Sequence, residues 1–327
     1  MIEIYNNFEL IGVNPVYSEF TWTRRFSRSG EFRLVTSFTT EYFEKLAEGN
    51  VLYKRDVDEA GIIERRQVIS TIKGDLALVV EGRHLSTMLD RRVFSLQGGM
   101  PLNQAINNII NNNFMAPAGN LRSMEVDGLR FMPHNIPAVN ISIESRNMNA
   151  YSQIVNLCEE NGLGFKIRYN LRNRTYDLMF LNPTETDVAF SKEFGNIVEQ
   201  NYMDDKQPYK NVVIIEDQHI HNNTVFTGIN RREVAISAPR EGQSHFTQSA
   251  LDALHENRAI KILSSTVNPY SQQFLYLQDW DIGSIVLTRN RELDFSKREV
   301  ISEIVEIYGE EGLSLVVNMG DHIERRR

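Results

Sequence analysis

The sequence predicts a mainly β protein with an α+β insert and two β-barrel-like domains. Near the C-terminus, three apolar runs of strand length lie at residues 279–287, 300–307 and 313–320. They are rich in β-branched residues and are separated by polar turns, which is the pattern of an antiparallel β-meander. The first ninety or so residues also have almost wholly the pattern of strands, and the pattern changes to a helical repeat after Gly82.

The N-terminal region is expected to consist of short antiparallel strands. Asn6-Asn7 separates two apolar runs and tolerates the positive φ of a tight hairpin turn. A short helix is expected at residues 40–46, with Thr39 or Thr40 as its N-cap and Gly49 beyond its end. The expected strands are 2–5, 8–11, 20–26, 31–37, 51–55, 62–72 and 76–81.

The run 62–72 is long for a strand, and its middle, Glu64-Arg65-Arg66-Gln67, has little apolar surface. We expect this strand to bend or to project at a sheet edge, where charge prevents unwanted pairing.

A helix-then-hairpin segment is expected to form the insert. Helical periodicity covers 85–92, and Pro101 begins a helix that extends to 113, where Asn111-Asn112-Asn113 is a stop signal. A second helix at 151–161 ends at Gly162. Residues 114–148 are expected to be loop-rich, and 164–169 with 175–181 to form a hairpin.

The remaining elements complete the domain organisation. We expect strands at 197–203 and 209–216, a polar loop at 217–246 and a helix at 247–262. The predicted domains are a first β-barrel-like domain (1–98 with 184–216), an inserted α/β subdomain (99–183), a connector (217–265) and a second β-barrel-like domain (266–327).

Two local features of the C-terminal meander carry structural predictions. In its central run, Ile301, Ile304 or Val305, and Ile307 are expected to be buried, with Ser302, Glu303 and Glu306 on the solvent face. In Asp279-Trp280-Asp281-Ile282-Gly283, the glycine permits an unusual backbone, and a preceding carboxylate can accept hydrogen bonds from nearby amides.

Composition is that of an ordinary globular protein. The 327 residues are 41% hydrophobic and 24% charged, with a net charge of −8, which argues against a protein that grips nucleic acid along an extended surface. No apolar run is long enough to span a bilayer and the N-terminus lacks the pattern of a signal peptide, so we expect folding in a cytoplasm. The single cysteine, Cys158, is expected to be a small buried hydrophobe.

Paired basic residues are expected to be solvated at turns and strand ends, or alternatively to form salt bridges between subunits. These pairs are Arg24-Arg25, Arg65-Arg66, Arg91-Arg92, Arg231-Arg232 and Arg325-Arg326-Arg327.

No motif predicts catalytic, cofactor-binding or metal-binding residues. Gly242-Gln243-Ser244-His245-Phe246 lacks the second glycine of a nucleophile elbow, and Gly162-Leu163-Gly164 has the reverse topology of a dinucleotide-binding turn. His219 and His221 have no third ligand at a suitable spacing, and the segment after His255 lacks a second histidine. Paired acids are expected on solvated faces, at Glu159-Glu160, Asp204-Asp205 and Glu310-Glu311.

Four N-terminal segments and the 279–287 entry with the strands after it form one ordered set along the chain. The N-terminal segments are Ile4-Tyr5-Asn6, Phe20-Thr21-Trp22-Thr23-Arg24-Arg25-Phe26, Gly30-Glu31-Phe32-Arg33-Leu34, and Val79–Leu85 with Leu89-Asp90-Arg91-Arg92. In their order and spacing these segments resemble one known family, the trimeric baseplate hub or tail-tip proteins of long-tailed phages and phage-tail-like contractile particles.

The resemblance implies a non-enzymatic virion protein without cofactors. It implies a homotrimer that joins a tail tube or distal tail protein to a spike or tail-tip protein, with the tape measure protein and transiting DNA in its lumen and no insertion into a membrane. Any lysozyme or peptidase domain would then belong to a separate protein. The alternative is a cell-wall hydrolase or glycan-binding tail-tip module that acts on the host envelope.

Overall fold

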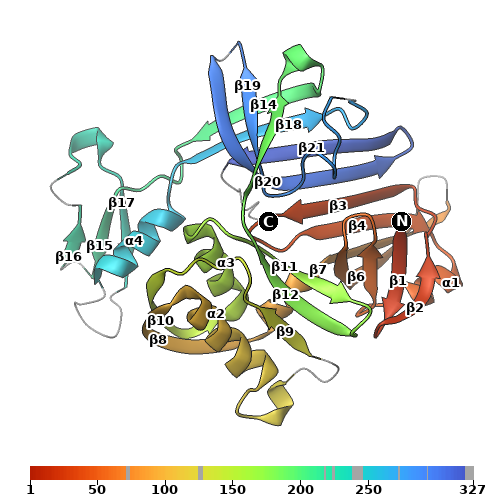
Figure 1. Cartoon of the computed structure of the whole chain (residues 1–327), viewed down its shortest axis with the longest axis horizontal. Coiled ribbons are helices and arrows are strands. Elements are labelled where there is room, and N and C mark those ends of the chain that lie inside the picture. Colours follow the sequence, from red (N-terminus) through yellow and green to blue (C-terminus); the bar gives the residue numbers. More distant parts are fainter. Residues whose placement is uncertain are drawn as a thin grey trace. The chain divides into compact units, whose positions relative to one another are not determined.

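The computed structural model describes residues 1–70, 74–123, 128–216, 219–222, 225–237, 246–271, 273–292 and 294–320 (Figure 1). Most of the regular structure is strand, so the mainly β fold class is confirmed. The chain divides into two compact units, one of residues 1–199 and 265–317 and the other of residues 200–264 and 318–327. In the described ranges, no helix is long and apolar enough to cross a membrane.

The N-terminal strands form one antiparallel array in the order β3-β4-β7-β6-β5-β1-β2 (Figure 1). The predicted hairpin at Asn6-Asn7 is confirmed, with positive φ at Asn7 and Phe8. The predicted N-cap is also confirmed, because the Thr39 hydroxyl accepts a hydrogen bond of 3.0 Å from the Tyr42 N–H. The elements are β1 (Ile2–Asn6), β2 (Glu9–Val13), β3 (Glu19–Arg25), β4 (Glu31–Ser37), α1 (Thr40–Lys45), β5 (Val51–Lys54), β6 (Glu59–Ser70) and β7 (Leu76–His84).

Strand β6 bends as predicted, through a bulge between Ile63 and Arg65. Its first residues, 59–62, pair with β5, whereas from Arg65 onward its pairing within the described residues is with β7 alone. The charged half of β6 therefore lies at a sheet edge.

The C-terminal strands form the predicted meander and join the N-terminal array. Strand β20 (Phe295–Gly309) lies between β21 (Gly312–Gly320) and β3 in the sheet order. Its residues 303–308 pair antiparallel with β3, and its residues 295–300 pair antiparallel with β19 (Ser284–Asn290), so strands from both ends of the sequence lie side by side (Figure 1). Strand β13 (Thr184–Phe190) extends the array by parallel pairing with β19.

The predicted burial of β20 is wrong at three positions. Glu306 is completely buried and Ile307 is 36% exposed. Because side chains alternate along a strand, Glu306 lies on the same face as Ile304 and Tyr308. This face is buried, since distant residues provide partners for the Glu306 carboxylate. Glu303, which was also expected in solvent, is buried beside Arg25.

The segment between β7 and β13 packs around two helices. The apolar side chains of α2 (Leu102–Ile110) and α3 (Ala150–Glu160) share one core with those of β11 (Gly164–Asn170) and β12 (Thr175–Leu181). The predicted hairpin is confirmed by the antiparallel β11–β12 pairing, and Gly162 has the positive φ expected after α3. The helical run after Gly82 is a 3₁₀ helix, η1 (Leu85–Arg91).

Two expectations for this segment are wrong. The stop signal at Asn111 does not end the helical backbone, which continues as a π-helical turn, η2 (Asn111–Met115), followed by η3 (Asn120–Arg122). The expected loop contains β9 (Leu129–Met132) and β10 (Asn140–Asn149), because β10 has a long antiparallel partner in β8 (Val93–Pro101) and β9 pairs with β12.

The second unit contains a small sheet in the order β16-β15-β17, packed against α4 (Phe246–Glu256). Ala250 and Ala253 of α4 share a core with Val213 and Ile215 of β15. The expected loop 217–246 includes strands, and the predicted helix ends early, where Asn257 donates to the Ala253 carbonyl and β18 follows. The strands are β14 (Ile197–Asp205), β15 (Val212–Ile215), β16 (His219–His221), β17 (Glu233–Ile236) and β18 (Ile260–Val267).

Candidate functional site

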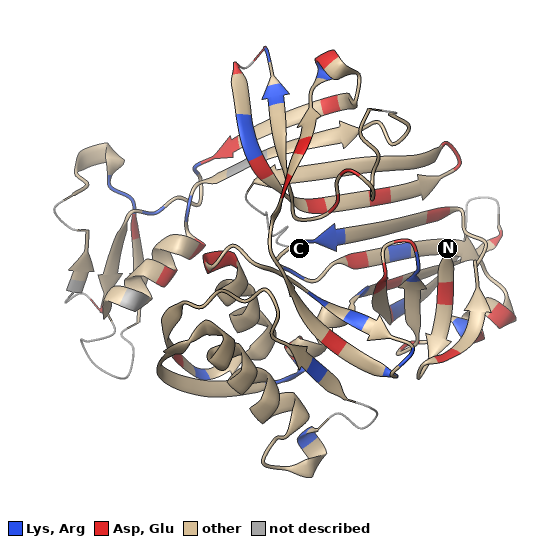
Figure 2. Cartoon of the chain, in the orientation of Figure 1, with Lys and Arg blue, Asp and Glu red and all other residues tan. Residues whose placement is uncertain are grey.

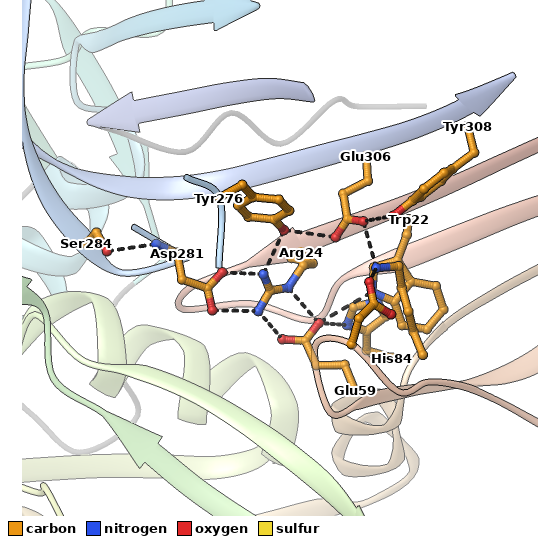
Figure 3. Close-up of polar contacts among 11 residues, drawn as sticks. Trp22, Arg24, Glu59, His84, Tyr276, Asp281, Ser284, Glu306 and Tyr308 are labelled. Carbon is orange, nitrogen blue, oxygen red and sulfur yellow. Dashed lines mark hydrogen bonds and ion pairs between the residues drawn. The ribbon is translucent and has the colours of Figure 1, made fainter. Parts of the chain in front are cut away.

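A buried ion-pair network lies between the N-terminal and C-terminal strands of the first unit (Figure 3). Its centre is the guanidinium of Arg24 on β3, whose side chain is 2% exposed. Arg24 Nε and Nη2 donate to the two carboxylate oxygens of Glu59, at 3.0 and 2.9 Å. Phe20, Trp22 and Arg24 alternate along β3 and all three are buried, so the strand period places the arginine on an apolar face.

The same guanidinium binds the segment that precedes β19. Arg24 Nη1 donates to the Tyr276 hydroxyl at 2.9 Å, and Nη2 donates to Asp281 Oδ2 at 3.2 Å. A planar fork of donors can contact several carboxylate oxygens at once, which suits arginine to this position. Arg24 therefore ties β3, β6 and the 276–281 segment together.

A second buried carboxylate extends the network. Glu306 accepts hydrogen bonds from the hydroxyls of Tyr276, at 2.9 Å, and Tyr308, at 2.5 Å. Lys54 Nζ lies 2.8 Å from Glu306 Oε2 and also contacts Asp56. Because Tyr276 accepts from Arg24 and donates to Glu306, its hydroxyl links the two ion-paired groups.

The network holds its groups in fixed charge states. Burial would raise the pKa of Glu59, but Arg24 outweighs it and lowers this pKa to about 2. Burial would lower the pKa of Arg24, but Glu59, Tyr276 and Asp281 raise it well above its ordinary value. Burial lowers the pKa of the neighbouring His84 imidazole to about 4, so this ring is neutral at pH 7.

These charge states define what the network can do. Burial, followed by Glu306, raises the pKa of Tyr308 far above its ordinary value, so this hydroxyl remains a donor. Arg24 forms an ion pair with Glu59, and Lys54 forms one with Glu306. Each of the four groups is bound by its neighbours, which fits a clamp between strands and leaves no free acid, base or nucleophile among them.

Phe26 forms a second junction, directly after β3. A Cβ added at Gly164 or at Gly283 would lie 2.5 Å from atoms of the Phe26 ring. Gly283 also has a φ of +82°. The Phe26 backbone donates to Ser302 O at 3.0 Å and accepts from Phe165 N–H at 2.9 Å. The two glycines are required because the ring fits against bare backbone of β11 and of the turn before β19.

The 279–283 entry behaves mostly as predicted. Asp279 Oδ2 accepts from the Leu275 N–H at 2.6 Å, which is the expected bond from a carboxylate to a backbone amide. Asp281 instead binds Arg24. Trp280 is buried and packs edge-on against Phe190 of β13.

The basic pairs have different environments. Arg24 is buried in the network, so the expectation that it is solvated or bridges subunits is wrong. Arg25 pairs with Glu31 and Glu303, and Arg65 with Glu81. Charges of both signs are interspersed over the strands of the first unit (Figure 2). Arg325, Arg326 and Arg327 lie outside the described residues.

The residues considered for chemistry lie on different elements of the structure. Cys158 is buried, and burial raises the pKa of its thiol. His219 and His221 lie on β16, whereas His255 lies on α4 beside Arg258. Within the described ranges, no group of three or more His, Cys, Asp or Glu side chains could hold a metal ion. Residues 242–245 of the elbow-like segment are outside those ranges.

The paired acids differ from one another. Glu159 does not follow the expected pattern, because it accepts from Arg28 Nε at 2.7 Å and its side chain is only 14% exposed. Glu310 and Glu311 are exposed at the β20–β21 turn. Asp205 accepts from the Gln207 N–H in a turn.

Sequence reasoning did not find Lys54, Glu59 or Glu306. A signal existed for Glu306, which lies two residues from both Ile304 and Tyr308 and therefore on their face of the strand. For Lys54 and Glu59 we identify no comparable local signal.

The family model for Siphovirus ReqiPepy6 Gp37-like protein matches residues 1–321. The chain belongs to this phage protein family. The expected resemblance to phage tail proteins is thereby confirmed. Among curated proteins, no sequence matches this chain.

Several solved structures share the fold of this chain. A tail protein from Neisseria meningitidis is 13% identical with a TM-score of 0.60, and the match covers 98% of this chain and 96% of that one. The 43 kDa tail protein of prophage MuSo2 from Shewanella oneidensis is 12% identical with a TM-score of 0.59, and covers 98% of each chain. An E. coli component of the type VI secretion system is 12% identical with a TM-score of 0.54, and the match covers 99% of this chain and 78% of that one.

Proposed function

We propose that this protein is a structural baseplate hub or tail-tip protein of a phage or phage-tail-like particle, and that it forms a homotrimeric ring. The observation that carries the proposal is agreement in fold over whole chains: 98% of this chain matches 96–98% of two tail proteins. The E. coli type VI component is described as similar to the T4 tail proteins gp27 and gp5, which favours a place near the tail tip.

The proposed role is that of a symmetry adaptor. Each chain contributes an N-terminal and a C-terminal group of strands, so three chains would present six groups to a sixfold tail tube while the ring remains threefold. The proposed neighbours are a tail tube or distal tail protein on one face and a spike or tail-tip protein on the other.

The lumen would pass DNA and the tape measure protein. A net charge of −8 supports this, because acidic walls repel phosphate and so keep transiting DNA from binding. The ring would be part of the virion tail and would be assembled in the cytoplasm of the bacterial host.

We propose a non-enzymatic role. The buried network supports it, since Arg24, Glu59, Lys54 and Glu306 neutralise one another between strands. A ring subunit under mechanical load benefits from such cross-strand contacts, whereas a hydrolase needs a carboxylate or nucleophile that reaches substrate.

Light scattering of the purified chain tests the ring. The expected mass is three times the chain mass of 37.7 kDa, and negative-stain electron microscopy should show threefold particles with a central opening. A monomer at all concentrations, both alone and with a tail tube protein, would contradict the trimer. A peptidoglycan zymogram tests the alternative, because clearing by the purified chain would contradict the non-enzymatic role.

A further inference from the structure

An open cavity of about 510 Å³ lies between the end of η1, β8, η2, η3 and the last residues of β10. Its described polar lining consists of three arginines and three neutral side chains, and none of the described lining residues is an aspartate or glutamate. The polar lining residues are Arg91, Arg92, Arg122, Ser95, Asn113 and Asn147. We call this cavity the arginine pocket.

The guanidinium groups of the arginine pocket are held by neutral acceptors. Arg92 donates to the carbonyls of Arg91 and Arg122, at 3.0 and 3.1 Å, and lies over the Phe114 ring. Arg122 donates to the Val93 carbonyl at 3.1 Å and to Asn113 Oδ1 at 3.2 Å. These bonds position two cations without neutralising either of them.

No carboxylate of the described residues forms an ion pair with Arg91, Arg92 or Arg122. The acid nearest to Arg91 and Arg92 in the sequence, Asp90, is already bound by Arg83 at 3.3 Å and by the Asn149 amide at 2.9 Å. Glu125 and Asp127, which follow Arg122 in the sequence, lie outside the described residues. Arg92 Nε is buried and has no acceptor among the described residues. Three cations around one cavity repel one another, so an anionic ligand gains from all three.

The rim of the pocket indicates what kind of anion fits. Val93 is 57% exposed and Leu121 is fully exposed, and both line the same cavity. A small inorganic anion would use the arginines and leave these apolar side chains in water. A peptide segment with acidic and apolar side chains would cover both, since protein interfaces combine buried apolar contacts with charge complementarity.

We propose that the arginine pocket binds an acidic segment of a partner protein, with carboxylates on the guanidinium groups and an apolar side chain against Leu121 and Val93. Nucleic acid is disfavoured, because its binding needs an extended basic surface and the chain as a whole is acidic. The site goes beyond the proposed function, because its lining residues all lie between Arg91 and Asn147 of one chain and binding requires no trimer.

Fluorescence anisotropy tests the proposal, with a labelled peptide that alternates Glu and Leu and a matched peptide with Gln in place of Glu. Arg91→Glu is the informative variant, because no hydrogen bond or ion pair in the described residues uses the Arg91 guanidinium. Arg172→Glu, at the exposed β11–β12 turn, is the matched control for the change of charge. Thermal unfolding should show that both variants fold.

We expect the Glu peptide to bind the unmodified chain in a salt-dependent manner and the Gln peptide to bind far more weakly. Arg91→Glu should weaken binding of the Glu peptide about tenfold or more, whereas Arg172→Glu should not. Leu121→Ser should also weaken binding but leave its salt dependence unchanged.

The proposal is overturned if the Glu peptide does not bind, or if it binds Arg91→Glu as tightly as the unmodified chain. Displacement of the peptide by inorganic phosphate at equal concentration would assign the pocket to a small anion instead. Tighter binding of single-stranded DNA than of the peptide would assign it to nucleic acid. None of these results depends on whether the chain forms a trimer, so the two proposals can fail separately.

Discussion

Lys54 on β5 and Glu306 on β20 form a buried ion pair, with 2.8 Å between Lys54 Nζ and Glu306 Oε2 and almost no exposure of either side chain. The pair joins strands from opposite ends of the sequence. Loss of one partner leaves a buried charge uncompensated, and this makes the pair a sensitive probe of the interface between the two strand groups.

Glu306→Gln should lower the free energy of unfolding by about 3–5 kcal/mol, because Lys54 loses its fully buried partner and keeps only the partly exposed carboxylate of Asp56. Denaturant unfolding monitored by circular dichroism measures this change. Glu310→Gln, at the exposed β20–β21 turn, is the control and should change stability by less than about 0.5 kcal/mol. Equal effects of the two substitutions would show that the carboxylate of Glu306 has no special role.

Arg24→Lys should destabilise the protein by about 1.5–3 kcal/mol, because lysine keeps the charge but cannot contact Glu59, Tyr276 and Asp281 together. The matched control is Arg33→Lys, since Arg33 pairs with Glu19 at an exposed position, where such pairs contribute about 0–1 kcal/mol. Thermal unfolding of both variants checks the difference. If Arg24→Lys does not lower the melting temperature more than Arg33→Lys does, the positive charge alone maintains the junction and the several donors of the guanidinium are not needed.

Stability should fall as the pH is lowered from 7 to 5, through His84. Its pKa is about 4 in the folded chain and about 6.5 when unfolded, so the unfolded chain binds the proton more tightly over this window. The loss between pH 7 and pH 5 should be about 2 kcal/mol. Glu59 contributes only at lower pH, because its pKa falls from 4.5 to about 2 on folding.

His84→Phe should flatten this pH dependence, because the titrating group is gone, whatever its effect on stability at pH 7. His134→Phe, at an exposed position, should leave the dependence as it is in the unmodified chain. Denaturant titrations at several pH values between 7 and 5 measure how steeply the free energy of unfolding of each variant changes with pH. An unchanged slope in His84→Phe would assign the pH dependence to other groups.

Gly283→Ala should destabilise the protein by about 2–5 kcal/mol. The new Cβ would lie 2.5 Å from the Phe26 ring at a φ of +82°, which combines overpacking with a left-handed backbone. Gly309→Ala is the control, because nothing lies within 4 Å of a Cβ at that position. Differential scanning calorimetry measures the melting temperatures of the two variants. Similar melting temperatures would mean that the Phe26 ring moves aside at little cost in free energy.

The local elements of this protein were predictable from sequence. Helix α1 with its Thr39 cap, the Asn6-Asn7 hairpin and the C-terminal meander depend on residues within a few positions of one another. Turn chemistry, capping and alternation act over such distances, so each signal is present in the segment that it shapes. The bend of β6 was predictable for the same reason, because the run of charged residues that indicates it lies within the strand itself.

Long-range pairing was decided by the tertiary structure alone. Strand β10 forms in a segment read as loop because β8 provides its partner, and Glu306 turns inward because Lys54, Tyr276 and Tyr308 bind its carboxylate. A charged residue in a strand marks the solvent face unless a distant part of the chain supplies its counterion. The sequence by itself therefore determined the elements whose signals are local, whereas the fold decided which further segments become strands and which polar side chains are buried, since their partners lie far away in the chain.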